Sequence, residues 1–239
     1  MKIDQRIIIA LDTQCEKELN VLIKSLKGHA HYVKVGMELF YTFGPSIVSR
    51  LKNEGFKVFL DLKIHDIPNT ARKSCKTITK LGADIINVHS SGGIEMMKAA
   101  KKGVDEALEE NNNLTPPLLI AVTQLTSNDQ EMIEKDLLIN KPIHEVVTHY
   151  AKNASLAGFD GVVSSPLEVK LIKKTVHNKF ICITPGIRPE SSQKQDQKRV
   201  TTPKEAFLNG SDFIVIGRAI TQAKDPSKAF KDIIKELDL

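Results

Sequence analysis

Short apolar runs alternate with longer amphipathic stretches along the whole chain. The apolar runs are rich in Val, Ile and Leu and hold four to six residues each, which is typical of buried strands. They cover residues 6–11, 32–35, 57–62, 84–88, 118–123, 160–163, 180–184 and 212–216. Alternation of such runs with amphipathic stretches indicates a parallel sheet with crossover helices.

The amphipathic stretches predict the helices. They cover residues 16–26, 45–54, 69–81, 93–109, 143–156, 168–176, 203–208 and 227–237. Several of them are followed by Gly, as expected where a helix ends. No linker or low-complexity tract divides the chain, and about 250 residues is typical of a (β/α)8 barrel. We therefore expect an α/β protein with the TIM (β/α)8 barrel fold, formed as a single domain by residues 1–239.

Composition is compatible with a sizeable core. Of the 239 residues, 41% are hydrophobic and 26% are charged. No apolar run approaches the roughly 20 residues of a membrane span, and the first residues lead into a strand without a signal-peptide cleavage site. The three cysteines, Cys15, Cys75 and Cys182, lack the paired spacing of a zinc or redox motif. We expect a cytoplasmic protein without membrane association, whose cysteines are reduced.

The formal net charge of +5 does not by itself indicate nucleic-acid binding. The lysines are spread along the chain, aromatic residues make up only 5%, and there is no Trp to stack on bases. His144 and His149 are five residues apart, whereas a zinc-binding pair on one helical face is four apart. Anionic small molecules are the expected ligands, with no nucleic acid and no metal.

Polar residues follow most of the expected strands, at the end where a barrel enzyme carries its site. They are Asp12, Lys34, Asp61, Lys63, His89, Ser90, Thr123, Thr126, Ser127, Ser164, Ser165, Pro185, Gly186, Gly217 and Arg218. A single charged strand end is weak evidence of a site. A ring of five charged residues from four strands is difficult to explain as solvated surface.

The segment at residues 59–68 is the most informative. Side chains alternate along a strand, so Phe59, Asp61 and Lys63 should share one face. Asp66 follows where Pro68 must end the strand. These charges could form an ion pair of purely structural value, but the ring of charges favours a catalytic site.

At residues 61–70 the sequence Asp-Leu-Lys-Ile-His-Asp-Ile-Pro-Asn-Thr resembles the signature of the orotidine 5′-monophosphate decarboxylase family. The resemblance extends over essentially the whole chain. It includes the motifs at residues 9–12, 33–40, 122–127, 184–188, 196–197 and 215–218.

The resemblance implies a cofactorless decarboxylation of orotidine 5′-monophosphate to uridine 5′-monophosphate in pyrimidine biosynthesis. Asp61 would lie beside the substrate carboxylate and Lys63 would protonate C6 of the pyrimidine. Lys34 would link Asp61 and the ribose, and Asp12 would bind ribose hydroxyls. A homodimer is also implied, in which Asp66, Ile67 and Thr70 reach into the neighbouring subunit's site.

The resemblance assigns the remaining ligand contacts as well. Thr126 and Ser127 would contact the base, and Pro185 would line its pocket. The phosphate would be held by Arg188, Gln197, Gly217 and Arg218. The loops after strands seven and eight often form the phosphate site of such barrels, which supports this assignment independently. The polar run at residues 188–199 could close as a lid or could be a solvated loop.

The residues themselves are suited to this chemistry. Loss of CO₂ from C6 leaves an electron pair in an sp² orbital without an adjacent electron sink. A fixed ammonium group such as that of Lys63 can stabilise this charge and then protonate it.

Two other functions remain possible at this stage. A Mg²⁺-dependent sugar-phosphate decarboxylase or synthase of the same barrel superfamily has a similar Asp-x-Lys-x-x-Asp strand, but an acidic residue then follows the second strand, where this chain has Lys34. A sugar-phosphate epimerase is disfavoured because His and Asp pairs do not recur at the strand ends. A barrel that only binds phosphorylated ligands is the alternative from a non-catalytic class.

Overall fold

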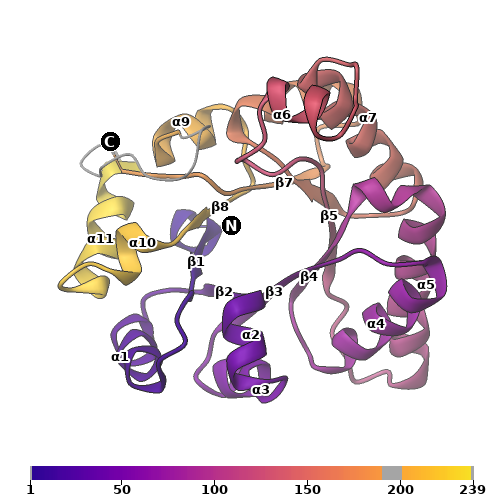
Figure 1. Ribbon diagram of the computed structural model, residues 1–239. Helices are drawn as coiled ribbons and strands as arrows, with labels where there is room; N and C mark the ends of the chain where they lie inside the picture. The colour runs from indigo at the N-terminus through magenta and orange to yellow at the C-terminus, as the bar shows by residue number, and fades with distance from the viewer. Residues whose placement is uncertain (1, 190–200, 238–239) are drawn as a thin grey trace.

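Eight parallel strands close into a barrel in the computed structural model, which describes residues 2–189 and 201–237 (Figure 1). Each strand pairs with the next in the sequence, and β8 pairs with β1. The strands are β1 (Ile7–Ala10), β2 (Tyr32–Gly36), β3 (Lys57–Ile64), β4 (Ile85–His89), β5 (Leu118–Val122), β6 (Gly161–Val163), β7 (Ile181–Thr184) and β8 (Phe213–Ile216). The expected TIM-barrel fold is confirmed.

Helices surround the barrel on the outside (Figure 1). They are α1 (Glu16–Leu26), α2 (Met37–Phe43), α3 (Ser46–Asn53), α4 (Pro68–Lys80), α5 (Gly93–Glu110), α6 (Gln130–Lys135), α7 (Ile143–Leu156), α8 (Val169–Thr175), α9 (Pro203–Leu208), α10 (Arg218–Thr221) and α11 (Pro226–Leu237). Short 3₁₀ helices are also formed by Ile3–Arg6, Ser90–Gly92 and Pro166–Glu168. Within the described ranges, no helix has the length and apolar character that crossing a bilayer requires.

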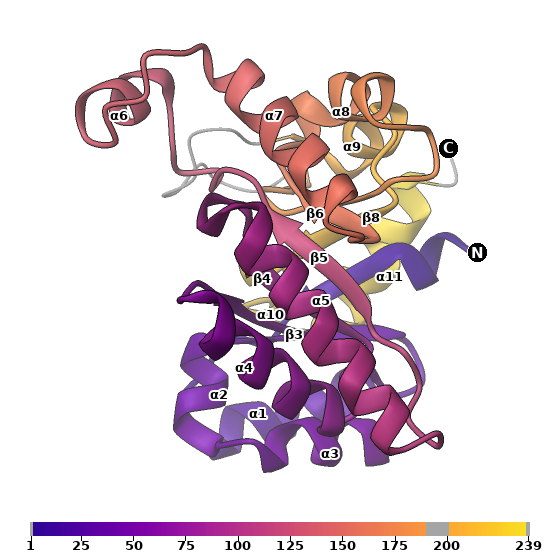
Figure 2. The same ribbon diagram turned by 90° about the vertical axis from the view of Figure 1, so that its right-hand side faces the viewer.

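The expected helices have the observed bounds to within about a turn, and α1, α7 and α9 match at both ends. Three short helices, α2, α6 and α10, follow strands directly or lie within loops, and the sequence pattern did not predict them. Each has seven residues or fewer. Figure 2 shows α6 standing out from the rest of the molecule.

Alternation along the strands divides the core into two layers. Inside the barrel, Ile8, Tyr32, Phe59, Ile120 and Phe213 pack together in one buried cluster. The intervening residues of the same strands pack outward against the helices in a second, larger cluster. This pleat places Phe59 inside the barrel, one side-chain layer below Asp61.

A Gly-x-Asp sequence recurs at three loops that lead from a helix into a strand. The Asp carboxylate of each loop accepts a hydrogen bond from a backbone N–H at the start of the preceding strand. The three bonds are Asp84 to Val58, Asp160 to Leu119 and Asp212 to Cys182, each 2.8 Å long. The glycines before them have φ of 80°, 82° and 96°, a region that favours Gly. These loops fasten neighbouring strands at the amino-terminal end of the barrel.

Replacing one of these aspartates should destabilise the fold without affecting ligand binding. Asp212→Ala leaves the Cys182 N–H without its partner and removes the 2.8 Å ion pair with Lys173. We expect the free energy of unfolding to fall by about 1–3 kcal/mol, the cost of an unsatisfied buried donor. Urea unfolding measures it. Asp232→Ala is the control, because it removes an exposed ion pair on α11 and should change the free energy of unfolding little. An equal loss of stability in the two variants would contradict the role assigned to Asp212.

Candidate active site

A cavity of about 780 Å³ opens at the carboxyl ends of the strands. Its lining includes ten of the residues predicted to act in catalysis or to bind the substrate: Asp12, Lys34, Asp61, Lys63, Thr126, Ser127, Pro185, Arg188, Gly217 and Arg218. Ala10, Phe59 and Val215 from the inner layer of the barrel also line it. The cavity therefore combines apolar side chains from the inside of the barrel with charged and polar groups, as ligand sites generally do.

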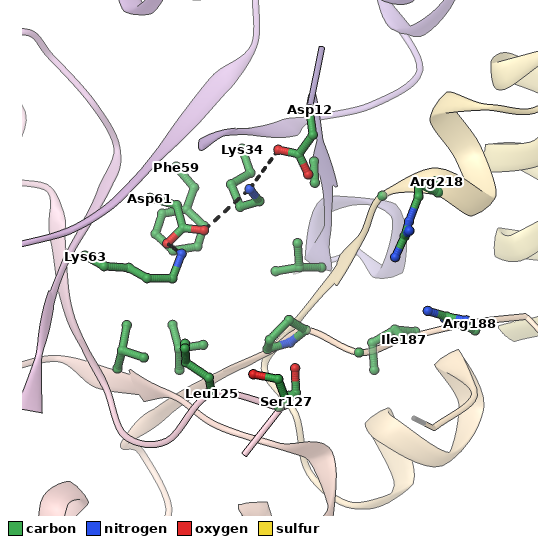
Figure 3. Close-up of a pocket in the computed structure, with 18 of the residues that line it drawn as sticks. Asp12, Lys34, Phe59, Asp61, Lys63, Leu125, Ser127, Ile187, Arg188 and Arg218 are labelled. Atoms are coloured by element: carbon green, nitrogen blue, oxygen red, sulfur yellow. Dashed lines mark hydrogen bonds and ion pairs between the residues drawn. The ribbon is translucent and has the colours of Figure 1, made fainter. Parts of the chain in front are cut away.

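Four charged side chains form an alternating chain on one side of the cavity (Figure 3). The Lys34 ammonium lies 3.2 Å from Asp12 Oδ1 and 3.4 Å from Asp61 Oδ2. The Lys63 ammonium lies 2.7 Å from Asp61 Oδ1. Adjacent strands supply these groups, because β1 ends just before Asp12, Lys34 lies on β2, and Asp61 and Lys63 lie on β3.

The chain of charges shifts the pKa values of its buried members. Burial by itself would raise the pKa of Asp61, but Lys34 and Lys63 together with hydrogen bonds from Lys63 and Asn87 hold it below its ordinary value. Burial would likewise lower the pKa of Lys34, but Asp61 and Asp12 raise it above its ordinary value. Both groups are therefore charged at neutral pH.

The backbone at Lys63 departs from the regular strand that the sequence pattern predicted. Strand β3 continues to Ile64, but its register against β4 shifts between Leu60 and Ile64. Lys63 has a φ of 51°, in the left-handed region that a side chain other than Gly rarely adopts. Simple alternation therefore does not explain why Asp61 and Lys63 face the same cavity. A bulge re-aims the lysine, as bulges beside active sites often do.

Asn87 on β4 is a site residue that the sequence analysis missed. Its Nδ2 donates to Asp61 Oδ1 at 2.7 Å, and its Oδ1 accepts from the Lys63 backbone N–H at 2.8 Å. Only 1% of Asn87 is exposed. The available signal was an amide between Ile86 and Val88 within an otherwise apolar strand, since a buried polar group needs partners.

Gly36 is a second residue that was missed. A Cβ atom at this position would lie 2.9 Å from Lys34 Nζ and 3.1 Å from Asp12 Oδ1. Any larger residue would therefore displace the ammonium group from its place between two carboxylates. No periodicity in the sequence indicated this requirement, because it arises from side chains of two other positions.

The opposite side of the cavity is cationic. Figure 3 shows Arg188, after β7, and Arg218, after β8, across the cavity from Lys63. Gly217 lies between β8 and Arg218, so the backbone approaches the cavity closely there. Two guanidinium groups beside one cavity are suited to a phosphate dianion.

Three of the predicted site residues that the structure describes do not line this cavity. Asp66, Ile67 and Thr70 lie at the start of α4, where Asp66 Oδ1 accepts from the Ile67 N–H at 2.7 Å and Ile67 is 68% exposed. Together they form the α4 edge, which is the end of the connection after β3 and the first turn of α4. Gln197, with most of the segment expected to act as a lid, lies outside the described residues.

No three His, Cys, Asp or Glu side chains among residues 2–189 and 201–237 are grouped as metal ligands would be. Two of the carboxylates that line the cavity, those of Asp12 and Asp61, have the Lys34 ammonium between them. A cation at that place would be repelled by Lys34.

The family model described as "Orotidine 5'-phosphate decarboxylase / HUMPS family" matches residues 5–233. The chain belongs to this family. It is 51% identical over 232 residues to the orotidine 5′-phosphate decarboxylase of Enterococcus faecalis, covering 97% of each chain. It is 49% identical to the enzyme of the same name from Lactococcus lactis, with 98% of each chain covered.

Solved structures of this family have the same fold. The crystal structure of orotidine 5′-phosphate decarboxylase from Lactobacillus acidophilus matches with a TM-score of 0.86 and 41% identity, over 98% of this chain and 100% of that one. The enzyme of that name from Pyrococcus horikoshii matches with a TM-score of 0.76 at 26% identity, over 98% and 99% of the two chains. The resemblance inferred from the motifs is confirmed.

The lowered pKa of Asp61 predicts how acid changes stability. A carboxyl with a lower pKa in the folded state stabilises the fold fully above its unfolded pKa, and this contribution is lost as pH falls through the folded pKa. The free energy of unfolding, relative to that of Asp61→Asn, should be constant from about pH 8 to about pH 5 and decrease below about pH 4. Urea unfolding across this range measures it. If the free energy of unfolding instead increased on acidification relative to that of Asp61→Asn, the pKa of Asp61 would be raised in the folded state rather than lowered.

Proposed function

We propose that this protein decarboxylates orotidine 5′-monophosphate to uridine 5′-monophosphate and CO₂, as a step of pyrimidine biosynthesis, without a metal or organic cofactor. The observation that carries the proposal is the alternating chain from Asp12 through Lys34 and Asp61 to Lys63, set across one cavity from two arginines. The names of the relatives supply the substrate.

Lys63 is the proposed proton donor. Breaking the bond between C6 and the carboxylate releases CO₂ and leaves its electron pair on C6. The Lys63 ammonium, already held toward the cavity by Asp61, stabilises this charge and transfers one proton to C6. Solvent returns a proton to the neutral amine after the product leaves.

Asp61 is proposed to lie beside the substrate carboxylate. Its charge repels that carboxylate more than the carbanion, whose charge lies further away. Asp61 also holds both lysines before the reaction begins. Fixed charge of this kind needs no reorganisation in the transition state, and we assign it the larger part of the effect.

The other cavity residues are proposed to bind the rest of the nucleotide. Asp12 and Lys34 lie beside each other and would hold the ribose hydroxyls. The base would contact Thr126, Ser127 and Pro185, and the phosphate would contact Arg188, Gln197, Gly217 and Arg218. The separation of the arginines from Lys63 across the cavity in Figure 3 supports this orientation of the nucleotide.

We further propose that a homodimer completes each site, with Asp66, Ile67 and Thr70 reaching into the neighbouring subunit. Apolar exposure around this edge supports a subunit contact there, since Ile67 is 68% exposed and Tyr41 is 74% exposed. Met37 and Tyr41 line a groove beside Lys63 and His65 on the same side of β3. The protein is proposed to act as one barrel domain in the cytoplasm.

Decarboxylation in EDTA tests the proposal, with loss of substrate ultraviolet absorbance as the readout. Lys63→Ala should fold normally by circular dichroism and lose activity by at least 10²-fold, because a general acid contributes about 10²–10⁴-fold. Lys57→Ala changes an exposed lysine at the other end of β3 and should retain wild-type activity. Retention of more than about a tenth of activity by Lys63→Ala would remove Lys63 from this role. Inhibition by EDTA that Mg²⁺ reverses would favour the sugar-phosphate alternative.

Subunit exchange tests the shared site. Asp66→Ala and Lys63→Ala homodimers should each be inactive, because every site lacks one charged group. In a mixed dimer, one of the two sites receives Lys63 from one chain and Asp66 from the other. Equal mixing should therefore restore about a quarter of the wild-type activity, since half of the dimers are mixed and half of their sites are intact. Absence of recovery after verified exchange would mean that Asp66 does not serve the neighbouring site.

The phosphate assignment predicts a substrate-dependent defect. Arg218→Ala should raise KM and lower kcat on the nucleotide together, because phosphate binding free energy can align the reacting groups. The phosphate-free nucleoside should be affected little, and added guanidinium ion should restore part of the lost activity. An equal loss on both substrates would show that Arg218 supports the barrel rather than the phosphate.

A further inference from the structure

The barrel contains one place where a side chain replaces the regular pairing between strands. Leu60 is in register with Ile86, and Ile64 is in register with Val88. Three residues of β3, Asp61 to Lys63, therefore lie opposite the single residue Asn87 of β4. On its other side, Asn87 pairs in regular register with Ile120 of β5.

The Asn87 amide spans this gap with two hydrogen bonds. The Lys63 backbone N–H, which can only donate, gives its hydrogen to Asn87 Oδ1 at 2.8 Å. The ionised Asp61 carboxylate, which can only accept, receives Asn87 Nδ2 at 2.7 Å. Each partner permits only one orientation of the amide, so the assignment of oxygen and nitrogen follows from the chemistry.

We propose that Asn87 is the positioning residue of this site, holding the Lys63 backbone in its left-handed conformation and the Asp61 carboxylate in line with both lysines. This inference rests on the proposed decarboxylation and deepens it. Asn87 lies behind Asp61 and does not line the cavity, so it acts through its two partners rather than on the substrate.

The strained conformation of Lys63 is the reason why such a residue is needed. A lysine with a φ of 51° is stable only where its surroundings fix it, and the bond from its N–H to Asn87 does so within the strand gap. Without this bond, the β3 backbone is free to return to an extended conformation. That change would turn the Lys63 side chain in another direction. The ammonium would then leave its place 2.7 Å from Asp61.

The neutral amide of Asn87 satisfies both partners at once. An apolar side chain of the same size would leave the buried Lys63 N–H without an acceptor. It would also remove one of the hydrogen bonds that the buried Asp61 carboxylate accepts. A carboxylate could accept from the N–H but would face Asp61 with a second negative charge. One proton shared between the two carboxyl groups would restore a donor toward Asp61.

Three variants test the proposal against wild-type protein. Asn87→Leu removes both bonds, and Asn87→Asp keeps the acceptor while making the donor dependent on a proton. Thr79→Val is the matched control, because Thr79 is a buried side chain whose single bond, to Cys75 O, lies within α4 away from the charged chain. Turnover of orotidine 5′-monophosphate, uridine 5′-monophosphate affinity and thermal unfolding are measured for each.

Asn87→Leu should lower kcat by about 10- to 100-fold, the range that loss of a buried hydrogen bond to a charged group produces. Affinity for uridine 5′-monophosphate should change by less than about threefold, because Asn87 does not touch the ligand. The ¹³C signal of the Asp61 carboxyl should titrate at a higher pKa than in wild type. This readout requires no turnover, so it tests the position of Asp61 even if the proposed reaction is wrong.

Asn87→Asp should give a kcat that depends on pH differently from that of wild type. Its kcat relative to wild type should be lowest near pH 8 and rise by about tenfold or more toward pH 5.5, as the shared proton restores the bond to Asp61. Thr79→Val should change stability alone. If Asn87→Leu does not fold, the comparison of Asn87→Asp with Thr79→Val still tests the proposal.

The proposal is overturned if Asn87→Leu retains kcat within about threefold and leaves the Asp61 titration unchanged. It is also overturned if kcat, product affinity and unfolding temperature all fall together while Asn87→Asp shows no acid recovery, which would assign Asn87 a role in folding alone. Wild-type protein that does not turn over the nucleotide would refute the proposed function instead, and the carboxyl titration would still decide the role of Asn87.

Discussion

The Asp61 carboxylate accepts hydrogen bonds or ion pairs from Lys34, Lys63 and Asn87, which come from three adjacent strands. Most of this carboxylate is buried, so it is stable there only because these donors offset its lost hydration. Removal of any one donor would leave a buried charge incompletely paired. The positions of both lysines, and hence the charge pattern facing a ligand, depend on this one group.

The barrel provides two conditions for this arrangement. Side chains inside the barrel, such as Phe59, fill the interior beneath the charged groups. The packed interior therefore leaves no space there for water to come between the charges. At the far end of the strands, Asp84, Asp160 and Asp212 fasten neighbouring strands through backbone N–H groups. The end of the barrel that stabilises the sheet is thus separate from the end that carries the cavity. The strained backbone at Lys63 is held in place by the regular strands around it.

The α4 edge connects the chemistry to assembly. The bulge at Lys63 is followed within a few residues by Asp66 and the exposed Ile67, which come directly before α4. Helix α4 in turn is held to α5 by ion pairs of Arg72 with Glu106 and of Lys76 with Glu110. The proposed contribution to a neighbouring subunit would therefore come from the first turn of a braced helix and from the two residues directly before it.

Much of this molecule could be predicted from its sequence, because strand and helix periodicity and the order of charged residues are local properties. The eight strands, the barrel and ten cavity residues followed from runs such as that around Asp61 and from the motifs that resemble the family. Tertiary structure decided the rest. The bulge at Lys63 and the bonds of Asn87 depend on atoms from another strand, and Asp12, which follows β1, limits the space beside Gly36 together with Lys34. No local pattern encodes such contacts, since they exist only when distant segments are brought within hydrogen-bond distance.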